Sequence, residues 1–493
     1  MKDDYQILNE LQARAAALRT AQTALDWGLQ TDAPVQSAEA TGKAMGLLAA
    51  EEMRLLVNDR VGACLSALAE TPRIDPVEQA VIKEWNRIYR DMKSVPPEIV
   101  GEYAELCGVA QAVWEQAKAH SNYERFAPYL EKLISLQIRI TQYRDTQGKS
   151  TYDALLNDYE EGYTTERLDS FFDELKCMLI PLCKKAAERH RQIDKSYNCR
   201  TYPAEKQRAF CTYLAAYAGF DFERGMLRES VHPFTTQLHN QDVRITTHYD
   251  ENNLESAIFS VIHETGHANY EFGVRNALNF TILAGGSTMG LHESQSRLYE
   301  NMIGRSRMFW IPVFPKLKET FPEQLADVSL NHFLRGINKT EPGLIRTEAD
   351  ELTYPLHIII RYEIEKKIFA GQLPVREIPA EWNRLYQEYL GITPPNDAMG
   401  VLQDVHWAGG SFGYFPSYAL GSAAAAQIFY HLAQVMPLDM YLKEGNLKPI
   451  QAYLTTHIYQ YGKMKRLDQA LADMTGEPLN PQYYMHYLQE KYA

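Results

Sequence analysis

Residues 252–267 read NNLESAIFSVIHETGH, and this stretch predicts a helix that carries two histidines on one face. The two asparagines at its start can cap a helix, and the apolar residues between 254 and 262 recur at helical spacing. His263 and His267 are four residues apart, so their imidazoles lie one turn above each other and can reach the same ion. The stretch therefore predicts both a helix and a metal site.

A catalytic zinc ion takes three protein ligands in a tetrahedron and leaves the fourth position to water. Glu264 is rotated off the ligand axis, where it can act on that water. The H-E-x-x-H pattern also arises by chance on helix surfaces, so a third ligand is needed to distinguish a zinc site from a chance match. Glu293 lies in a second helical segment and would complete a His, His, Glu set. Its neighbour His292 is the competing candidate, because imidazole is also a good zinc ligand.

The first half of the chain is predicted to be helical. From Leu8 to about Leu227, apolar residues recur at spacings of three and four among polar residues. Prolines interrupt this pattern at residues 32–34, 72–76, 95–97 and 202–203. No long linker or repeat of fixed period separates these segments.

We therefore expect one domain over residues 1–493, with a helical amino-terminal lobe over about residues 1–230 and the motifs of the site within residues 232–421. The predicted fold class is mainly α, a large two-lobed helical protein with a deep active-site cleft. A small β element is predicted beside the H-E-x-x-H helix, because Asp242 to Thr246 alternates with period two.

The composition limits the partners. With 63 acidic and 50 basic residues the formal charge is −13, which opposes binding to nucleic acid or to anionic membranes. The first ten residues, MKDDYQILNE, lack the basic and apolar regions of a secretory signal. We expect a cytoplasmic protein that binds neither nucleic acid nor a membrane.

A series of motifs in a fixed order makes the sequence recognisable. The chain resembles the carboxypeptidase Taq family of metallocarboxypeptidases over residues 232–421. The motifs that carry this resemblance are His232-Pro233-Phe234, Asp242-x-Arg244-x-Thr246, His263-Glu264-x-x-His267, His292-Glu293-Ser294-Gln295, Ile345-Arg346-x-x-Ala349-Asp350 and Gly400-x-x-Gln403-Asp404-x-His406-Trp407.

The resemblance implies the activity and the metal. It implies that Glu293 is the third ligand, which leaves His292 beside the site. It also implies one Zn²⁺ ion per chain, for which Co²⁺ or Mn²⁺ can substitute, a homodimer, and peptide substrates with a free carboxyl end. The expected reaction removes single amino acids from that end with broad specificity, and Glu264 acts as general base and then as general acid. The alternative is a helical zinc oligopeptidase or a dipeptidyl-carboxypeptidase, because the metal chemistry would be the same.

An oxyanion forms during peptide hydrolysis and needs a hydrogen-bond donor. His406 and Tyr418 are our candidates, with Tyr414 as a reserve donor and substrate contact, because a histidine followed by tyrosines is similar to the arrangement in related helical peptidases. The alternative is that these aromatic residues only pack.

The free carboxylate of the substrate needs a cation, ideally a guanidinium. Arg346 is the first candidate, in a predicted helical stretch where Asp350, Tyr354 and His357 share its face, and Arg244 is the second. Arg346 could instead pair with Asp350, and Arg244 with Asp242. The resemblance to related peptidases also implies that the strand at 242–246 is an edge strand that aligns the substrate backbone.

Overall fold

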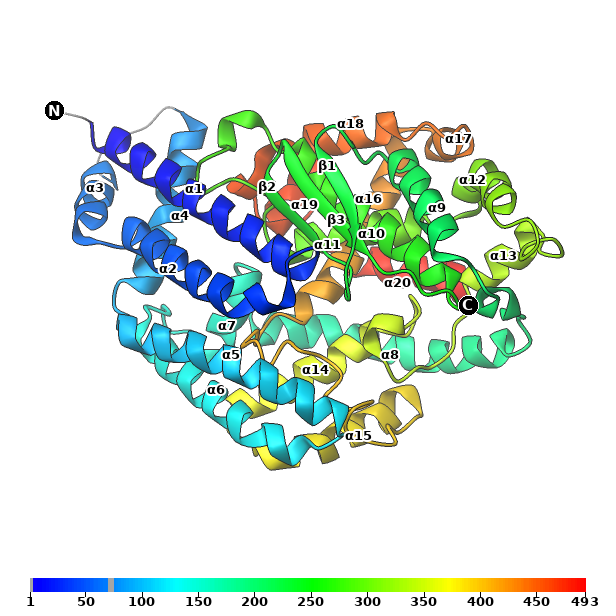
Figure 1. Ribbon diagram of the computed structural model, residues 1–493, viewed down its shortest axis with the longest axis horizontal. Coiled ribbons are helices and arrows are strands. Elements are labelled where there is room, and N and C mark those ends of the chain that lie inside the picture. The colour runs from blue at the N-terminus through cyan, green and yellow to red at the C-terminus, as the bar shows by residue number, and fades with distance from the viewer. Residues whose placement is uncertain (1–2, 70–74) are drawn as a thin grey trace. The chain divides into compact units, whose positions relative to one another are not determined.

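The computed structural model describes residues 3–69 and 75–493. This part of the chain is mainly helical with one three-stranded sheet, so the predicted mainly α class is confirmed. It divides into two compact units, each assembled from three stretches of chain (Figure 1). Unit 1 comprises Met1–Lys93, Asp194–Ile337 and Ala425–Leu479, and unit 2 comprises Ser94–Ile193, Asn338–Ala424 and Asn480–Ala493. The expected single domain over 1–493 stays a prediction.

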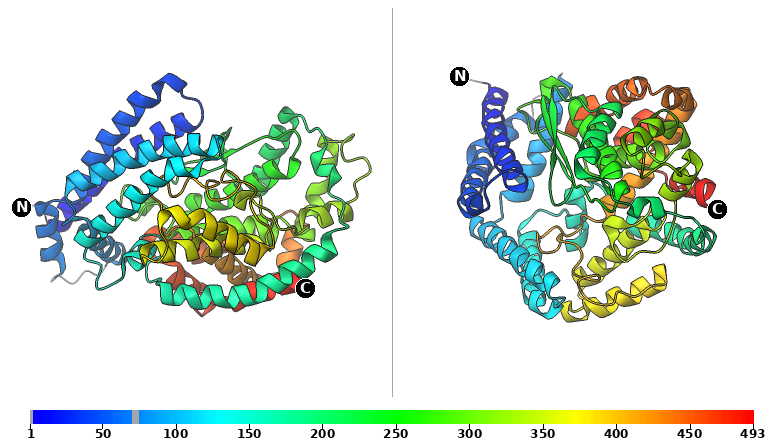
Figure 2. Two further views of the ribbon diagram at one scale, coloured as in Figure 1. Left: turned by 90° about the horizontal axis from the view of Figure 1, so that it is seen from below. Right: turned by 45° about the vertical axis from the view of Figure 1, so that its right-hand side comes forward.

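Unit 1 begins with four helices, α1 (Asp4–Gln30), α2 (Ala38–Leu56), α3 (Asp59–Ala69) and α4 (Pro76–Met92). Helices α1 and α2 run side by side, as Figures 1 and 2 show. The buried side chains of the four helices, among them Leu8 of α1 and Trp85 of α4, form a core that also includes Leu278 and Leu283. Leu278 and Leu283 precede the helix that carries Glu293, so this core supports the segment that leads into the predicted site.

The sheet of unit 1 has the order β1-β3-β2 and consists of β1 (Gly225–Glu229), β2 (Thr235–His239) and β3 (Asp242–Thr247). The predicted strand at 242–246 is confirmed as β3. It is parallel to β1 and antiparallel to β2, so it is the central strand. The prediction that 242–246 is a substrate-aligning edge strand is therefore wrong, because both of its edges are already paired. The strand β2 is an edge strand instead.

Helix α10 (Leu254–Gly273) begins where the sequence predicts, and the side chain of Asn253 caps it by accepting from the backbone N–H of Ser256 at 3.4 Å. One face of α10 packs on the sheet through a buried apolar cluster that contains Val261 and Ile245. The β element therefore lies beside the H-E-x-x-H helix, as predicted.

Helix α11 (Met289–Arg297) packs closely on α10 and continues into a π-helical turn, η4 (Leu298–Ile303). The close approach depends on Gly266. A Cβ atom at this position would lie 2.6 Å from the carbonyl oxygen of Gln295 and 2.7 Å from Cα of Ser296. A π-helical turn is a common feature of functional sites.

The remaining helices of unit 1 lie around α10 and α11. They are η2 (Ser196–Cys199), α9 (Ala204–Tyr217), η3 (Asn276–Leu278), α12 (Arg307–Thr320), α13 (Leu330–Ile337), α17 (Leu438–Lys443), α18 (Lys448–His457), η7 (Tyr459–Met464) and α19 (Leu467–Thr475), with η1 (Val35–Ser37) between α1 and α2.

Unit 2 is built from helices. They are α5 (Pro97–Ala119), α6 (Tyr123–Tyr143), α7 (Thr151–Tyr159), α8 (Thr165–His190), η5 (Arg346–Glu348), α14 (Tyr354–Phe369), η6 (Val375–Glu377), α15 (Ile378–Leu390), α20 (Gln482–Tyr492) and the first half of α16 (Pro416–Val435). Helices α7, α8 and α15 all pack against α14. The segment between α15 and α16 has no long helix, although much of it is buried.

The predicted helix breaks at residues 32–34, 95–97 and 202–203 are confirmed, whereas Pro72 lies outside the described residues. The continuous helix predicted from Arg346 to His357 is wrong. Its middle is not helical, because the Asp350 side chain accepts from the backbone N–H groups of Leu352 and Thr353 and so starts a new helix at α14.

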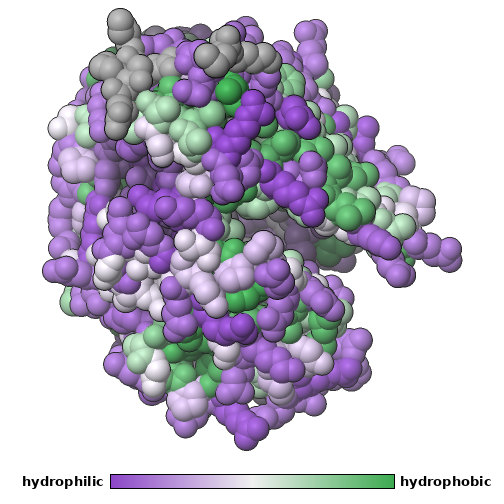
Figure 3. Space-filling model, turned by 90° about the vertical axis from the view of Figure 1, so that its left-hand side faces the viewer, coloured by the Kyte–Doolittle hydropathy of each residue, from purple (hydrophilic) through white to green (hydrophobic). Residues whose placement is uncertain are grey.

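Hydrophilic residues cover most of the face in Figure 3, and hydrophobic residues form smaller patches among them. Within residues 3–69 and 75–493, no helix has both the length and the apolar character needed to cross a membrane.

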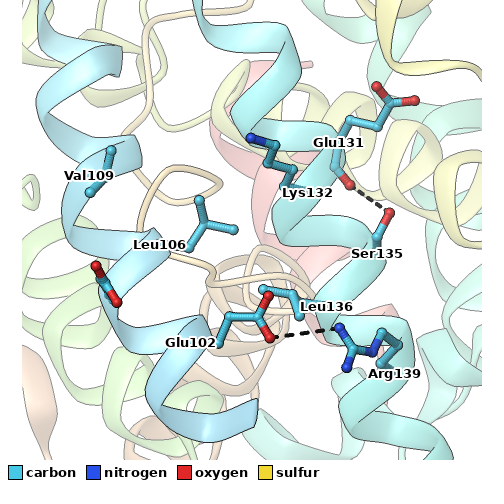
Figure 4. A pocket seen from close by; sticks show the side chains of 9 residues that line it. Glu102, Leu106, Val109, Glu131, Lys132, Ser135, Leu136 and Arg139 are labelled. Atoms are coloured by element: carbon cyan, nitrogen blue, oxygen red, sulfur yellow. Dashed lines mark hydrogen bonds and ion pairs between the residues drawn. The ribbon is translucent and has the colours of Figure 1, made fainter. Parts of the chain in front are cut away.

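A cavity of about 630 Å³ lies between α5 and α6 in unit 2 (Figure 4). Leu106 and Leu136 line it together with an ion pair, in which the charged atoms of Glu102 and Arg139 are 3.7 Å apart. No predicted site residue lines this cavity. A different face of α5 carries Tyr103, whose hydroxyl donates to the carbonyl oxygen of Gly410 at 2.9 Å. Helix α5 therefore lies between the cavity and the segment that contains His406.

Replacing Gly266 with alanine is expected to lower the melting temperature of the metal-free protein, because overpacking of this kind costs about 1–3 kcal/mol. The added methyl group has to push α11 away from α10. Differential scanning calorimetry measures the change. Gly46→Ala is the matched control, since Gly46 lies within α2 with no atom within 4 Å of an added Cβ, and helix propensity then favours alanine by about 1 kcal/mol. Equal melting temperatures for both variants would contradict the role given to Gly266.

Candidate active site

Three side chains of unit 1 converge as the sequence predicts. Oε2 of Glu293 lies 3.6 Å from Nε2 of His263 and 3.4 Å from Nε2 of His267. The three ligand atoms all lie within 4.8 Å of one another. The histidines come from α10 and the glutamate from α11, so the close contact of these two helices at Gly266 brings the set together.

The outer nitrogens of both histidines are held by neighbouring side chains. Nδ1 of His263 lies 2.8 Å from Oε2 of Glu300, to which it donates its proton. Nδ1 of His267 lies 2.6 Å from Nδ1 of His292, and Nε2 of His292 lies 2.7 Å from Oε1 of Glu271. In the tautomers that satisfy this chain, each Nδ1–H of the histidine pair donates outward and each Nε2 keeps its lone pair for a ligand.

The Glu293 carboxylate is fixed by two donors on its own helix. Its Oε1 accepts from Nε of Arg297 at 2.6 Å, and its Oε2 accepts from the Ser296 hydroxyl at 3.0 Å. Burial opposes ionisation, but Arg297 and His263 hold the pKa of Glu293 well below its ordinary value. The carboxylate is therefore ionised at neutral pH.

The donor set fits a divalent metal ion. Two atoms bound to a tetrahedral zinc ion at about 2.1 Å lie about 3.4 Å apart, close to the separations of Glu293 from the two histidines. Burial lowers the pKa of His267 to about 3, so this ring is neutral at neutral pH, as a metal ligand must be. His292, the competing ligand candidate, turns toward His267 and does not join the set.

Glu264 lies beside the ligand histidine on α10 and is 6% exposed. Its Oε2 accepts from the hydroxyl of Thr235 on β2 at 2.5 Å, whereas Oε1 has no hydrogen-bond partner within residues 3–69 and 75–493. Burial raises the pKa of Glu264, which favours the uptake of a proton. The edge strand β2 therefore orients the carboxyl group that the sequence predicts as the base.

A second group of predicted site residues gathers in unit 2. Nε2 of His406 lies 3.1 Å from the hydroxyl oxygen of Tyr418, and the His406 ring packs on Phe415 with a centroid distance of 4.5 Å. The centroid of the Tyr414 ring lies 5.5 Å from that of His406 and 5.0 Å from that of Tyr418. Burial and then Arg346 lower the pKa of His406 to about 3, so its imidazole is neutral at neutral pH.

Arg346 lies next to this group and is bound to Asp404. Its Nε and Nη2 atoms contact Oδ1 of Asp404 at 2.9 Å and 2.8 Å, while Nη1 makes a longer contact of 3.3 Å with the Tyr354 hydroxyl. The other carboxylate oxygen, Oδ2, contacts Nη2 of Arg361 at 2.6 Å. Arg346 is thus not paired with Asp350, and the ion pair considered as the alternative for it is wrong.

Arg244 lies on β3 and forms the pair considered as its alternative. Its Nε and Nη2 atoms contact the two oxygens of Asp242 at 2.8 Å and 2.7 Å, and its guanidinium lies 5.5 Å from the centre of the Trp27 ring. Both arginines predicted to bind the substrate carboxylate therefore have an acidic partner.

The sequence predictions miss three residues that contact the site. Glu271 follows His267 by four residues, and Glu300 follows Glu293 by seven, so helical spacing could have found both. Thr235 is different, because only the position of β2 beside α10 brings its hydroxyl to Glu264.

The comparisons with known proteins agree with this geometry. The family described as "Carboxypeptidase Taq (M32) metallopeptidase" matches residues 7–492. Carboxypeptidase 1 of Bacillus subtilis (strain 168) is 44% identical, with 95% of this chain and 94% of that protein covered. Thermostable carboxypeptidase 1 of Thermus thermophilus is 36% identical, with 99% and 98% covered.

A solved structure from the same family also matches this chain over its whole length. The crystal structure of the M32 carboxypeptidase from Deinococcus radiodurans R1 matches with a TM-score of 0.95 and 33% identity, and the match covers 100% of this chain and 99% of the other. With ligand geometry, family match and full-length relatives in agreement, the chain belongs to the carboxypeptidase Taq (M32) family and is a metallocarboxypeptidase that acts on peptides with a divalent metal ion.

Proposed function

We propose that this metallocarboxypeptidase releases single amino acids of many kinds from the carboxyl end of peptides, with Zn²⁺ held by His263, His267 and Glu293. The observation that carries the proposal is the convergence of these three ligand atoms beside Glu264. We further propose that Co²⁺ or Mn²⁺ can replace zinc, because geometry and availability decide between these ions. A homodimer and a cytoplasmic location stay predictions.

Glu264 moves the proton in this mechanism. A divalent ion bound in such a set supplies Lewis acidity, which lowers the pKa of water to about 7 and polarises a carbonyl. Oε1 of Glu264 takes a proton from the attacking water, and the same carboxyl group then delivers it to the departing amine. The hydrogen bond from Thr235 to Oε2 supports this role, because it leaves Oε1 to exchange the proton.

We assign the donors of the oxyanion to His406 and Tyr418, with Tyr414 in reserve. The low pKa of His406 supports a neutral imidazole, which donates one N–H and carries no charge. The 3.1 Å distance between Nε2 of His406 and the Tyr418 hydroxyl supports the assignment of these two neighbouring side chains together. Loss of one such donor typically lowers turnover by about 10² to 10³.

Arg346 is our first candidate for the cation that binds the free carboxylate of the peptide. Its contacts with Asp404 use one edge of the guanidinium, and Nη1 on the other edge makes a long contact of 3.3 Å with Tyr354. Arg244 is the second candidate, although both of its donors to Asp242 are short.

The proposed reaction predicts stepwise shortening of an unblocked peptide by single residues, followed by mass spectrometry with zinc- or cobalt-loaded protein. Glu264→Gln should abolish this release while it still binds the metal, because the amide cannot accept and return the proton. Internal fragments or dipeptides would assign the enzyme to the oligopeptidase or dipeptidyl-carboxypeptidase class instead. No release with any metal would refute the proposal.

The hydrogen bond between Nδ1 of His263 and Glu300 is expected to strengthen metal binding. Glu300→Gln should weaken zinc binding by about 10- to 100-fold, as loss of such a partner typically does, because the neutral amide attracts the Nδ1 proton of His263 less strongly than the carboxylate does. A competition titration with a chromophoric chelator measures the affinity. The control is Glu319→Gln on the surface of α12, where Lys316 is the partner at 3.0 Å. An unchanged affinity for Glu300→Gln would show that this contact does not tune the ligand.

The carboxylate-binding role predicts a selective change in KM. Arg346→Lys keeps a positive charge next to Asp404 but loses the flat guanidinium, so KM for peptides with a free carboxyl end should rise about tenfold. The KM for carboxyl-amidated peptides should stay the same. Arg384→Lys is the control, since Arg384 pairs with Glu381 and Glu388 on the surface of α15. Equal changes in KM for free and amidated peptides would remove Arg346 from this role.

A further inference from the structure

Much of the segment that carries His406 is buried, although this segment is neither a helix nor a strand. Leu402, Ala408 and Phe412 are each at most 1% exposed. A buried loop cannot leave its polar groups to water, so other side chains have to bind them. The indole of Trp114 donates to the carbonyl oxygen of Leu402 at 3.0 Å, and the ammonium group of Lys118 donates to that of Gln403 at 2.9 Å. These contacts hold the start of the segment.

Glu365 on α14 binds the turn that follows His406, and it binds both ends of that turn. Its Oε1 accepts from the indole Nε1 of Trp407 at 2.7 Å, and its Oε2 accepts from the backbone N–H of Gly413 at 2.8 Å. Trp407 follows His406 directly, and Gly413 precedes Tyr414 directly. One carboxylate thus joins the two points between which the chain turns.

Helix α7 fixes the same carboxylate from the other side. The hydroxyl of Tyr152 donates to Oε2 of Glu365 at 2.9 Å. Gly413 lies against the backbone of this helix, where a Cβ atom would be 2.8 Å from the carbonyl carbon of Leu155, and its φ is +84°. Only glycine fits this position, so the turn, α7 and Glu365 pack as one assembly.

Glu365 has no cationic hydrogen-bond partner in the described part of the chain. The residue is 0% exposed, and the guanidinium of Arg361, which acts on it electrostatically, binds Asp404. Burial raises the pKa of Glu365 to about 7, so the charge is costly to keep in this position. A buried charge that is costly and held only by neutral donors contributes geometry more than stability.

We propose that Glu365 is a positioning residue, which sets the orientation of His406 and Tyr418 by holding both ends of the turn from Trp407 to Gly413. The inference rests on the proposed function of His406 and Tyr418 as oxyanion donors. Two acceptor atoms that face in different directions are needed, and a carboxylate has them. An amide has one acceptor and one donor group, so it can hold only one end of the turn.

The test is the variant Glu365→Gln with the full chain loaded with zinc. We expect kcat for release of carboxyl-terminal residues to fall by about 10- to 100-fold, because small misplacements of catalytic groups have effects of this size. We expect KM and the zinc affinity to stay the same. Glu363→Gln is the matched control on the same helix, where the partners are Lys176 at 2.6 Å and Tyr389 at 2.8 Å, and it should keep the wild-type kcat.

Melting temperatures separate positioning from a structural role. The folded-state pKa of Glu365 is raised above its ordinary value of 4.5, so this group costs wild-type stability increasingly as the pH rises from about 4.5 to 7. The facing titratable or charged groups are Tyr152 and Tyr159 of α7 and Arg361 of its own helix. The melting temperature of Glu365→Gln minus that of wild type should therefore be larger at pH 8 than at pH 5. If Glu365→Gln melted below wild type at pH 8, the proposal would be overturned in favour of a structural role.

A double variant tests whether Glu365 acts through His406. The combination of Glu365→Gln with His406→Ala should lower kcat by less than the product of the two single effects, because Glu365 acts partly through His406, whereas effects that multiply in full would contradict the proposal. Trp407→Phe removes one donor to the carboxylate and should also lower kcat, which provides a second variant if Glu365→Gln does not fold. An unchanged kcat in both variants would overturn the inference. A wild-type enzyme that releases no single residues would instead refute the proposed function.

Discussion

The hydrogen bonds to the outer nitrogens of His263 and His267 are the constraint on which the rest of the site depends. An imidazole offers its Nε2 lone pair to a metal only while the proton stays on Nδ1. Glu300 holds that proton for His263, and His292 holds it for His267. Glu271 in turn fixes His292. Glu271 lies on α10 and His292 on α11, and Glu300 lies on η4, which continues α11, so the helices that carry the ligands also carry the groups that orient them.

The carboxylates of Glu293 and Glu300 are ionised and buried near each other, so positively charged side chains have to compensate their charge. Glu293 and Glu300 share Arg297, which contacts them at 2.6 Å and 3.2 Å, and Arg305 adds a second contact to Glu300 at 3.3 Å. Burial opposes ionisation of Glu300, but Arg297 and His263 together lower its pKa to about 2. The charges that orient the ligands therefore also stabilise one another, and a bound cation adds to a network that is already balanced.

Local patterns in the sequence predict the centre of the site well, because one helix supplies its spacing. The cap at Asn253 and the pair of histidines four residues apart depend only on α10, and both agree with the structure. Glu293 requires more, since from the residues alone His292 is a competing candidate, and the resemblance to the family decides between them. The turn of His292 toward His267 is a consequence of packing between α10 and α11.

Non-local contacts explain what the sequence could not predict. The alternation of 242–246 identifies a strand, but its central place depends on β1 and β2, which are short and alternate weakly. Likewise, the spacing of four between Arg346 and Asp350 suggests an ion pair only if the chain between them is helical. The Asp350 side chain instead accepts from the backbone N–H groups of Leu352 and Thr353 just before α14, and Arg346 contacts Asp404, 58 residues later in the chain.

The two buried carboxylates around His406 differ in what compensates them. Asp404 has two arginines, and although burial opposes its ionisation, they hold its pKa well below the ordinary value, so this pair network stabilises unit 2 at neutral pH. Glu365 is 0% exposed and is held by an indole, a backbone amide and a phenol, none of which carries a charge. Neutral donors compensate a charge less well than guanidinium groups do. The same segment thus has one acid that anchors it firmly and one that fixes its shape at a cost to stability.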